Sequence, residues 1–260
     1  MEKLYVIKIG GNIVDNPALL TECLTAFSNL KGQAILVHGG GKLATEMATS
    51  MGVDQTMVEG RRITDAETLK IVTMVYAGYI NKNIVAQLQG LGVHALGLTG
   101  TDGNLISAHK RTGTKIDYGF VGDVDSVNTN LLKKLLGDGI KLVIAPITHD
   151  GYGQLLNTNA DTIAQSIATG MAKEYEVHLI YGFEREGVLA DINDPSSVIA
   201  FIDRPVYGTL KDQKVIFEGM IPKIDNAYLA LEGGVQSVII GKAEKMNELI
   251  NGTAGTTIKI

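Results

Sequence analysis

Three consecutive glycines, Gly39, Gly40 and Gly41, lie between a short apolar run and a helical pattern. The run over residues 34–37 is too short for a helix and predicts a buried strand. After the glycines, apolar residues recur at helical spacing until Gly52. Glycine lets a ligand come close to the main chain, and a helix N-terminus offers unpaired N–H groups with a partial positive charge. The junction therefore predicts either an anion-binding site or only a tight turn.

A second glycine pair, Gly10 and Gly11, follows another apolar run over residues 4–9 and favours the anion-binding site. That run is interrupted by one charged residue, Lys8. Burying an ammonium group is costly unless an anion meets it. The alternative is an edge position from which the ammonium group reaches solvent. Because Lys8 lies beside the glycine pair, we interpret it as a functional group.

Strand and helix patterns alternate along most of the chain. Further short apolar runs stand at residues 94–98, 142–145, 177–181, 235–240 and 257–260. This alternation predicts an α/β fold with a mostly parallel sheet that helices cover on both faces. Ligands in such folds bind beyond the carboxyl ends of the strands, which is where both glycine clusters fall.

Other segments have weaker patterns. Thr64 and Glu67 have the spacing of a capping box, which predicts the start of a long helix over residues 65–88. Within that helix, Asn81 is expected to face solvent or a partner chain. Extended or hairpin segments are expected at residues 58–63, 104–127 and 149–156, and an irregular stretch at residues 182–219.

The chain has 260 residues, 45% of them hydrophobic, a formal net charge of −5 and a single cysteine, Cys23. The length fits one large domain or two closely joined lobes, with a soft boundary between residues 1–148 and residues 149–260. The acidic balance argues against a nucleic acid partner. Cys23 lies on the apolar face of a predicted helix, so we interpret it as a core residue. Without a membrane-spanning run or a signal-peptide pattern, a cytoplasmic protein with no membrane partner is expected.

Two helix starts in the second half carry polar side chains of interest. Asn159 and Asp161 have the positions of a cap and a first-turn acid, and the residues alone leave open whether they serve capping or chemistry. Lys223 stands in the first turn of a later helix, where a cation opposes the helix dipole. Local conflicts of this kind tend to mark functional sites.

Five short segments occur in the order found in amino acid kinases, which the chain resembles over nearly its whole length. They are Lys8 with Gly10-Gly11, His38-Gly39-Gly40-Gly41, Arg62 before Ile63-Thr64, Asn157-Thr158-Asn159-Ala160-Asp161, and Gly219-Met220-Ile221-Pro222-Lys223. The resemblance implies a three-layer sandwich with an open, mainly parallel sheet. It also implies an N-terminal lobe over residues 1–148 for the amino acid substrate and dimerisation, and a nucleotide-binding C-terminal lobe over residues 149–260.

The resemblance also implies roles for individual residues. Lys8 and Lys223 are expected to stabilise the transferred phosphoryl group, and Asp161 to hold the two lysines in place. Substrate binding is implied for Gly40, Gly41, Arg62, Asn157 and Asn159. Binding of the nucleotide phosphates is implied for Gly10, Gly11 and Gly39.

The implied activity is ATP-dependent phosphorylation of the side-chain carboxylate of N-acetyl-L-glutamate in arginine biosynthesis. A carboxylate is already ionised at neutral pH, so the reaction needs positioned positive charge rather than a general base. Mg²⁺ is expected to arrive with ATP, because the sequence offers no protein cage for a metal. Nothing in the motifs reads the acyl group, so N-succinyl-L-glutamate and a carrier-bound glutamate or aminoadipate remain alternatives.

Two departures from the family pattern affect these expectations. After the run over residues 177–181, relatives usually show an aspartate that is missing here, and Asp191 is a candidate replacement. Because this segment borders adenine and ribose in the family, a catalytically silent sensor of nucleotide or amino acid is the alternative class of function. The chain also starts directly at a strand, without the N-terminal helix of arginine-regulated hexameric relatives. A homodimer without that arginine feedback is therefore expected.

Overall fold

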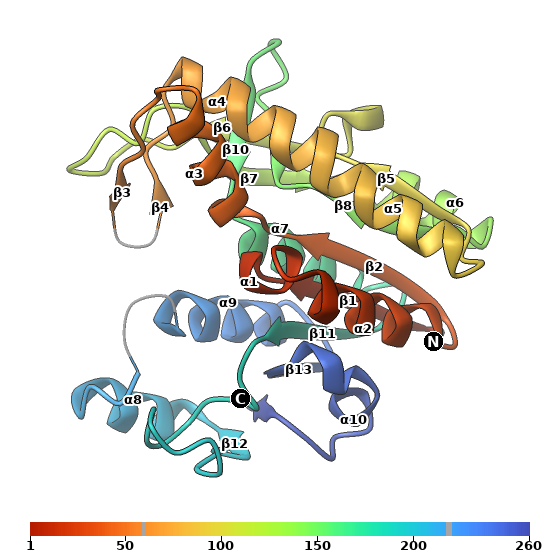
Figure 1. The fold of residues 1–260 in the computed structure, drawn as a ribbon. Coiled ribbons are helices and arrows are strands. Elements are labelled where there is room, and N and C mark those ends of the chain that lie inside the picture. The colour runs from red at the N-terminus through yellow and green to blue at the C-terminus, as the bar shows by residue number, and fades with distance from the viewer. Residues whose placement is uncertain (59–60, 217–219) are drawn as a thin grey trace.

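The computed structural model describes residues 1–58, 61–216 and 220–260, which form a central sheet between two layers of helices (Figure 1). The main sheet has eight strands in the order β12 (Phe201–Ile202), β14 (Thr256–Ile258), β13 (Ser237–Lys242), β11 (Glu176–Phe183), β1 (Lys3–Ile9), β2 (Gln33–His38), β8 (Lys141–Ile144) and β5 (Ala95–Leu98). Neighbouring strands are parallel except for β13 and β14, which are antiparallel. The predicted three-layer α/β sandwich with an open, mainly parallel sheet is confirmed.

Each face of the main sheet packs against its own set of helices. One face is covered by α6 (Thr129–Gly137), α7 (Ala160–Met171), α8 (Arg204–Asp212) and α9 (Met220–Glu232). The other face is covered by α1 (Gly11–Val14), α2 (Pro17–Ser28), α3 (Gly41–Ser50), α4 (Ala66–Thr73), η1 (Met74–Ile80), α5 (Asn81–Gly90) and α10 (Met246–Ile250). Along β1, Leu4 and Val6 point to the first core and Tyr5 and Ile7 to the second, as the two-residue period of a strand requires. Short 3₁₀ turns stand at Asp102–Asn104 and Ala243–Lys245.

Two smaller groups of strands complete the fold. Four strands close on themselves as a small barrel, namely β6 (Ile106–Lys110), β7 (Val121–Val127), β9 (Ile147–His149) and β10 (Leu155–Thr158). Because β10 leads directly into α7, this barrel holds the junction between them in place. The antiparallel hairpin of β3 (Met57–Val58) and β4 (Arg61–Arg62) reaches from one half of the molecule toward the other (Figure 1). Residues 59–60 of the predicted hairpin segment and Gly219 of the predicted motif that ends at Lys223 lie outside the described residues.

The centre of the sheet is the place where its strand order reverses. β1 pairs with β2 on one side and with β11 on the other. The chain first builds the sheet from β1 toward β5, and later returns to add β11 and β13 on the opposite side. Such a reversal opens a crevice beyond the carboxyl ends of the strands, where ligands bind in α/β folds. Lys8 lies at this end of β1, and Gly10 and Gly11 follow it.

Most of the expected elements are present, including both glycine junctions and the hairpin excursions between β6 and β7 and between β9 and β10. The core position of Cys23 is confirmed, because the residue is fully buried. Burial raises the pKa of the Cys23 thiol to about 12, so the thiolate is disfavoured. Within the described residues, no helix combines the length and the apolar character needed to cross a membrane.

Three local expectations are wrong. α4 is capped by Asp65, whose carboxylate accepts the Thr68 N–H, while the Thr64 hydroxyl donates to the Arg62 carbonyl instead. The expected single helix is interrupted by the π-helical segment η1, and Asn81 behind it is buried rather than solvent-facing. The stretch expected to be irregular contains β12 and α8, which begins with an Asp203 cap and an early proline.

Candidate functional site

Two lysines and one aspartate meet at the carboxyl end of β1. The Lys8 Nζ atom lies 2.9 Å from Asp161 Oδ1, and Lys223 Nζ lies 3.1 Å and 3.0 Å from the Oδ1 and Oδ2 atoms of Asp161. The side chains come from β1 and from the first turns of α7 and α9, and they are 13%, 15% and 8% exposed for Lys8, Asp161 and Lys223. We refer to these three residues as the lysine–aspartate cluster.

The cluster concentrates positive charge in a largely buried place. Burial alone would raise the pKa of Asp161, but the charges and hydrogen bonds of Lys8 and Lys223 outweigh it and hold the pKa well below its usual range. Burial lowers the pKa of Lys223, and the nearby Asp161 carboxylate opposes that shift. The Tyr181 ring lies 4.9 Å from Lys223 Nζ and adds a cation–π contact. With one carboxylate facing two ammonium groups, the cluster is suited to meet an anion.

The two glycine turns pack against each other beside the cluster. A Cβ atom on Gly11 would lie 3.4 Å from the Gly41 nitrogen, and one on Gly39 would lie 3.4 Å from the Gly11 nitrogen. Gly40 has a φ of +149°, and a Cβ there would lie only 2.2 Å from Ile80 Cδ1, so only glycine fits. Because α3 begins at Gly41, its first N–H groups have no helical partners and are available to an anion.

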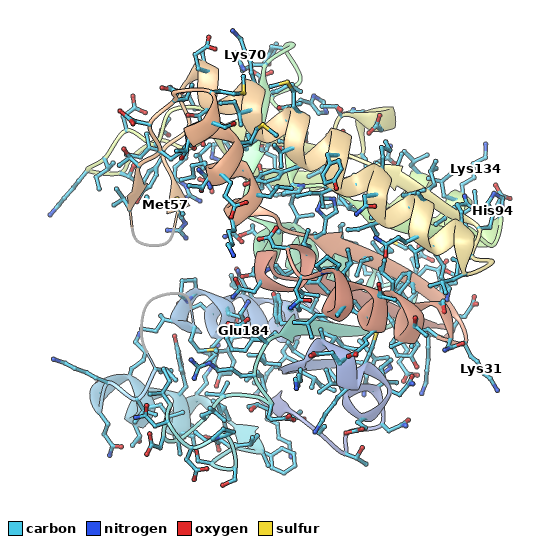
Figure 2. The ribbon with its side chains drawn as sticks, viewed as in Figure 1. Lys31, Met57, Lys70, His94, Lys134 and Glu184 are labelled. Atoms are coloured by element: carbon cyan, nitrogen blue, oxygen red, sulfur yellow. The ribbon has the colours of Figure 1, made fainter. Side chains whose placement is uncertain are left out.

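A cavity of about 790 Å³ is lined by residues from both halves of the chain. Its polar lining includes Lys8, Gly10, Gly11, Gly41, Arg62, Asp161 and Lys223. Its apolar lining consists of Met57, Phe183, Val188, Leu189, Ile192, Val215, Ile216 and Met220. Figure 2 shows Met57 on the β3–β4 hairpin and Glu184 beyond the end of β11, on opposite sides of this cavity. A cavity of this size with a cationic end suits a nucleotide-sized anion.

A second cavity of about 170 Å³ adjoins the first, since Gly41, Met57 and Arg62 line both. The rest of its lining combines glycine, amide, cationic and small apolar groups from Gly39, Gly40, Arg61, Tyr76, Arg111, Val121, Pro146, Asn157, Thr158, Asn159 and Ala160. Arginines and amides recognise carboxylates, whereas the apolar groups suit a short hydrocarbon chain. The small cavity therefore suits a compact carboxylic acid.

Two polar side chains of the small cavity, Arg62 and Asn157, are held by hydrogen bonds within the protein. Arg62 is buried, and its Nη2 donates to the Gly41 carbonyl and the Thr45 hydroxyl, both at 2.8 Å. Its Nη1 donates to the Gln55 side-chain oxygen. The Asn157 amide donates to the Thr64 hydroxyl at 3.0 Å. These bonds orient the groups in advance of ligand binding, which lowers the entropic cost of recognition.

The structure brings all of the predicted site residues to the two adjoining cavities. Lys8, Gly10, Gly11, Asp161 and Lys223 line the large one, Gly39, Gly40, Asn157 and Asn159 line the small one, and Gly41 and Arg62 line both. Asn159 also caps α7 by accepting the N–H groups of Asp161 and Thr162. Capping and site geometry are thus not alternatives here, because the cap fixes the turn that carries Asp161.

Several lining residues were missed by the sequence reasoning. Thr45 stands four residues after Gly41, and this helical spacing is the signal that could have found it. Arg111 directly follows β6 and lines the small cavity, and Asp123 holds it: its Nε lies 3.1 Å and 3.0 Å from the two carboxylate oxygens. Among the described residues of the large cavity, Glu184 is present and Asp191 is absent, so the candidate replacement for the missing aspartate stands apart from the lining.

The chain matches known proteins over nearly all of its length. A model of the amino acid kinase family matches residues 3–242. The acetylglutamate kinase of Cytophaga hutchinsonii is 55% identical and covers 99% of this chain, with 99% of its own length included. The acetylglutamate kinase of Parabacteroides distasonis is 54% identical over 95% of this chain and 97% of its own.

A solved structure supports the same fold. The N-acetylglutamate synthase of Neisseria gonorrhoeae, complexed with coenzyme A and N-acetyl-glutamate, matches 100% of this chain with a TM-score of 0.84 at 21% identity. The match covers 59% of that chain, and at this identity it speaks for the fold alone. From the family match and the two kinase relatives together, we conclude that the chain belongs to the amino acid kinase family.

Proposed function

We propose that this chain transfers the γ-phosphoryl group of ATP to the side-chain carboxylate of N-acetyl-L-glutamate, a step of arginine biosynthesis. The observation that carries the proposal is the lysine–aspartate cluster beside a nucleotide-sized cavity that adjoins a small one with arginine and asparagine side chains. The relatives named acetylglutamate kinase support the choice of substrate.

In the proposed reaction a carboxylate oxygen attacks the γ-phosphorus of ATP. A bond between that oxygen and phosphorus forms while the bond from phosphorus to the β,γ-bridging oxygen breaks, which leaves an acyl phosphate and ADP. The attacking carboxylate is already ionised, so no general base is required. The protein has to align the two substrates and stabilise the negative charge on the transferred group.

Each of these tasks has residues that fit it. Lys8 and Lys223 meet the oxygens of the transferred group, and Asp161 orients both ammonium groups. Arg62 binds a carboxylate of the acylglutamate, since charge-assisted pairs with arginine are strong and directional. The remaining substrate contacts come from Gly40, Gly41, Asn157 and Asn159, and the contacts to the nucleotide phosphates from Gly10, Gly11 and Gly39.

ATP is expected to carry Mg²⁺, which neutralises phosphate charge when it is bound. In the described part of the chain, no group of three or more His, Cys, Asp or Glu side chains could hold a metal ion. Asp161 is already committed to two lysines. The donor set therefore fits a metal held by the nucleotide phosphates and water rather than by a protein cage.

We assign residues 1–148 to acylglutamate binding and dimerisation, and residues 149–260 to nucleotide binding. The apolar groups that suit adenine support the second assignment, since Val188, Leu189 and Ile192 all follow β11. A cytoplasmic location agrees with ATP as substrate and with the single buried thiol of Cys23, which that compartment keeps reduced.

One observation favours a second candidate substrate, N-succinyl-L-glutamate. Arg61 lines the small cavity in addition to Arg62, as does Arg111, which is already paired with Asp123. An acetyl group is uncharged and gains nothing from further arginines, whereas a succinyl group ends in a carboxylate that one of them can pair with. The identity of the acyl group is therefore the feature of the substrate that an experiment should test first.

The experiment is a coupled assay of ADP release with a panel of acylated glutamates. We expect turnover with N-acetyl-L-glutamate or N-succinyl-L-glutamate and none with free glutamate. The ratio of kcat/KM values for the two substrates decides between the candidates. Tight nucleotide binding without ADP release from any member of the panel would instead indicate the silent sensor.

A further inference from the structure

A buried histidine and a buried asparagine lie directly behind the glycine turn and have no part in the proposed reaction. His38 ends β2 with no exposed surface, and Asn81 begins α5 with 1% of its surface exposed. The His38 Nδ1 atom lies 2.9 Å from the Gly39 carbonyl oxygen, and Nε2 lies 3.3 Å from Asn81 Nδ2. Buried polar groups are costly unless partners satisfy them, so such a pair calls for a physical reason.

The partners fix the direction of each hydrogen bond in this group. Asn81 Nδ2 also donates to the Val143 carbonyl at 3.0 Å, and Asn81 Oδ1 accepts from Lys82 Nζ at 3.0 Å, so both ends set the amide orientation. His38 Nε2 therefore accepts from Asn81, and His38 Nδ1–H donates to the Gly39 carbonyl. This is one neutral tautomer, in agreement with burial, which lowers the pKa of His38 to about 4.

The bond to His38 sets the orientation of the peptide that joins Gly39 to Gly40. In a trans peptide the carbonyl and the following N–H point in opposite directions. With the Gly39 oxygen turned toward His38, the Gly40 N–H is turned away from it, and Gly40 lines the small cavity. Within the described residues, the Gly40 N–H donates to no protein acceptor. This donor is thus left for a ligand.

The π-helical segment η1 holds the same turn from behind. A Cβ on Gly40 would lie 2.2 Å from Ile80 Cδ1 and 3.4 Å from Tyr76 Cδ1, so both side chains press on the glycine. Asn81 follows Ile80 directly, and π-helical turns often occur at functional sites. One turn of the helix therefore closes the space behind Gly40 and supplies the amide that orients His38.

We propose that His38 and Asn81 are positioning residues that keep the Gly40 N–H turned toward the small cavity, where the acylglutamate carboxylate receives the phosphoryl group. The inference rests on the proposed kinase function, because that function puts the reacting carboxylate at this turn. Neither side chain touches a substrate. They act through a preorganised backbone donor, and without them the Gly39 carbonyl is free to turn and present an oxygen where the reaction needs a hydrogen-bond donor.

Two substitutions of His38 separate positioning from packing. His38→Asn keeps an amide N–H near the position of Nδ1, whereas His38→Gln places its amide near the position of Nε2 and leaves the Gly39 carbonyl without a donor. Losing an oxyanion-hole donor costs about a hundred- to thousandfold in kcat, and we expect about ten- to a hundredfold for His38→Gln because its effect is indirect. His38→Asn is expected to stay within about threefold of the unmodified chain, and KM for ATP to change little in both variants.

The matched control is His178→Gln, which alters a partly buried histidine that lines neither cavity and bonds to Ser237 at 2.7 Å. We expect no loss of kcat there. A loss in His38→Asn as large as in His38→Gln, with unchanged melting temperatures, would overturn the proposal. An unaffected His38→Gln would overturn it as well.

Imidazole ¹⁵N NMR of the unmodified chain tests the geometry without an activity measurement. At pH 7 we expect His38 as the Nδ1–H tautomer, identified by the signal that His38→Asn lacks. In Asn81→Asp the new carboxylate cannot donate to Nε2, so Nε2 is expected to gain a proton. An active enzyme with the Nε2–H tautomer overturns this inference alone, whereas an unmodified chain with no kinase activity overturns the proposed function and this role with it.

Discussion

The proposed role of Lys8 in phosphoryl transfer depends on the compact shape of its ammonium group as well as on its charge. Its Nζ contacts Asp161 Oδ1 at 2.9 Å within a nearly closed cluster. In Lys8→Arg the charge remains, but a planar guanidinium spreads it over a wider fork that does not fit the same place. We expect kcat to fall by about a hundredfold or more while KM for the acylglutamate changes little. Steady-state kinetics with both substrates varied provide the check, and near-normal turnover would remove Lys8 from the mechanism.

Arg62 is expected to act on the acylglutamate side. Removing a hydrogen bond to a charged group costs roughly 1.5–3 kcal/mol, which corresponds to about ten- to a hundredfold in binding. Arg62→Ala should therefore raise KM for the acylglutamate by that factor and KM for ATP far less. Arg204→Ala removes a half-exposed arginine paired with Glu232 and serves as the control. If both Michaelis constants rise equally in Arg62→Ala, the assignment of Arg62 to the amino acid substrate is wrong.

His38 should also make stability depend on pH. Burial, together with the nearby Lys82 charge, outweighs the bond to the Gly39 carbonyl and lowers the pKa of His38 to about 4 in the folded chain, against 6.5 for an exposed histidine. Between these values the unfolded chain binds a proton that the folded chain does not. The free energy of unfolding should therefore fall as pH drops from about 6.5 to about 4, by at most about 3 kcal/mol from this group, and stay level above that window.

Urea unfolding at several pH values measures this dependence. His178, whose pKa half-burial also lowers, contributes in the same direction, so the comparison is with His38→Asn, in which His178 is retained. The slope of stability against pH should be shallower in that variant. Identical slopes would show that His38 has an ordinary pKa in the folded chain.

Individual site residues were predictable where a local rule marked them. Lys8 stood out as a charge in an apolar strand, Gly40 as a glycine at a strand–helix junction, and Asn159 as a cap. Asn81 could not be found in this way, because the partner that makes it a buried group, His38, lies 43 positions away in the chain. A residue whose burial and role depend only on contacts distant in the sequence leaves no periodic or capping signal.

At the scale of elements, η1 links the long helix to the glycine turn, and this link can be tested. Ile80 is 2% exposed and presses on Gly40. Ile80→Ala should lower the free energy of unfolding by about 2–5 kcal/mol and should also reduce kcat/KM, because the turn loses its support. Ile84→Ala, one helical turn onward and fully buried, should cost similar stability without that loss of activity. Equal activity in the two variants would contradict the link.

Most helices and strands were predictable from the spacing of apolar residues and from the glycines between them. Both faces of the sheet are buried, so each strand is a short apolar run. The π-helical segment was not, because the apolar residues from Val72 to Leu88 recur every four positions, a spacing that an uninterrupted α-helix also accommodates. α8 was missed although Asp203 followed by Pro205 is an ordinary helix start. There the charged composition of the stretch outweighed a valid capping signal.

At the scale of the molecule, the remaining question is what covers a free edge of the sheet. β5 is one of the two edge strands of the main sheet, and Leu96 on it is 36% exposed. On the adjoining long helix, Met74 and Tyr79 are 53% and 65% exposed, and they stand five residues apart within the π-helical segment. An edge strand beside exposed apolar side chains is a ready surface for pairing with a second chain.

We therefore expect a homodimer formed by a two-fold contact of this surface, since two-fold dimers are the commonest oligomers. Light scattering of the unmodified chain should give twice the mass calculated from the sequence. Tyr79→Glu places a charge in the contact and should give the monomer mass, because burying an unpaired carboxylate is costly. Phe201→Glu, which alters an exposed aromatic residue on the opposite edge strand β12, should leave the dimer intact. A monomeric unmodified chain would contradict the dimer. A dimer that persists in Tyr79→Glu would show that the contact lies on another surface.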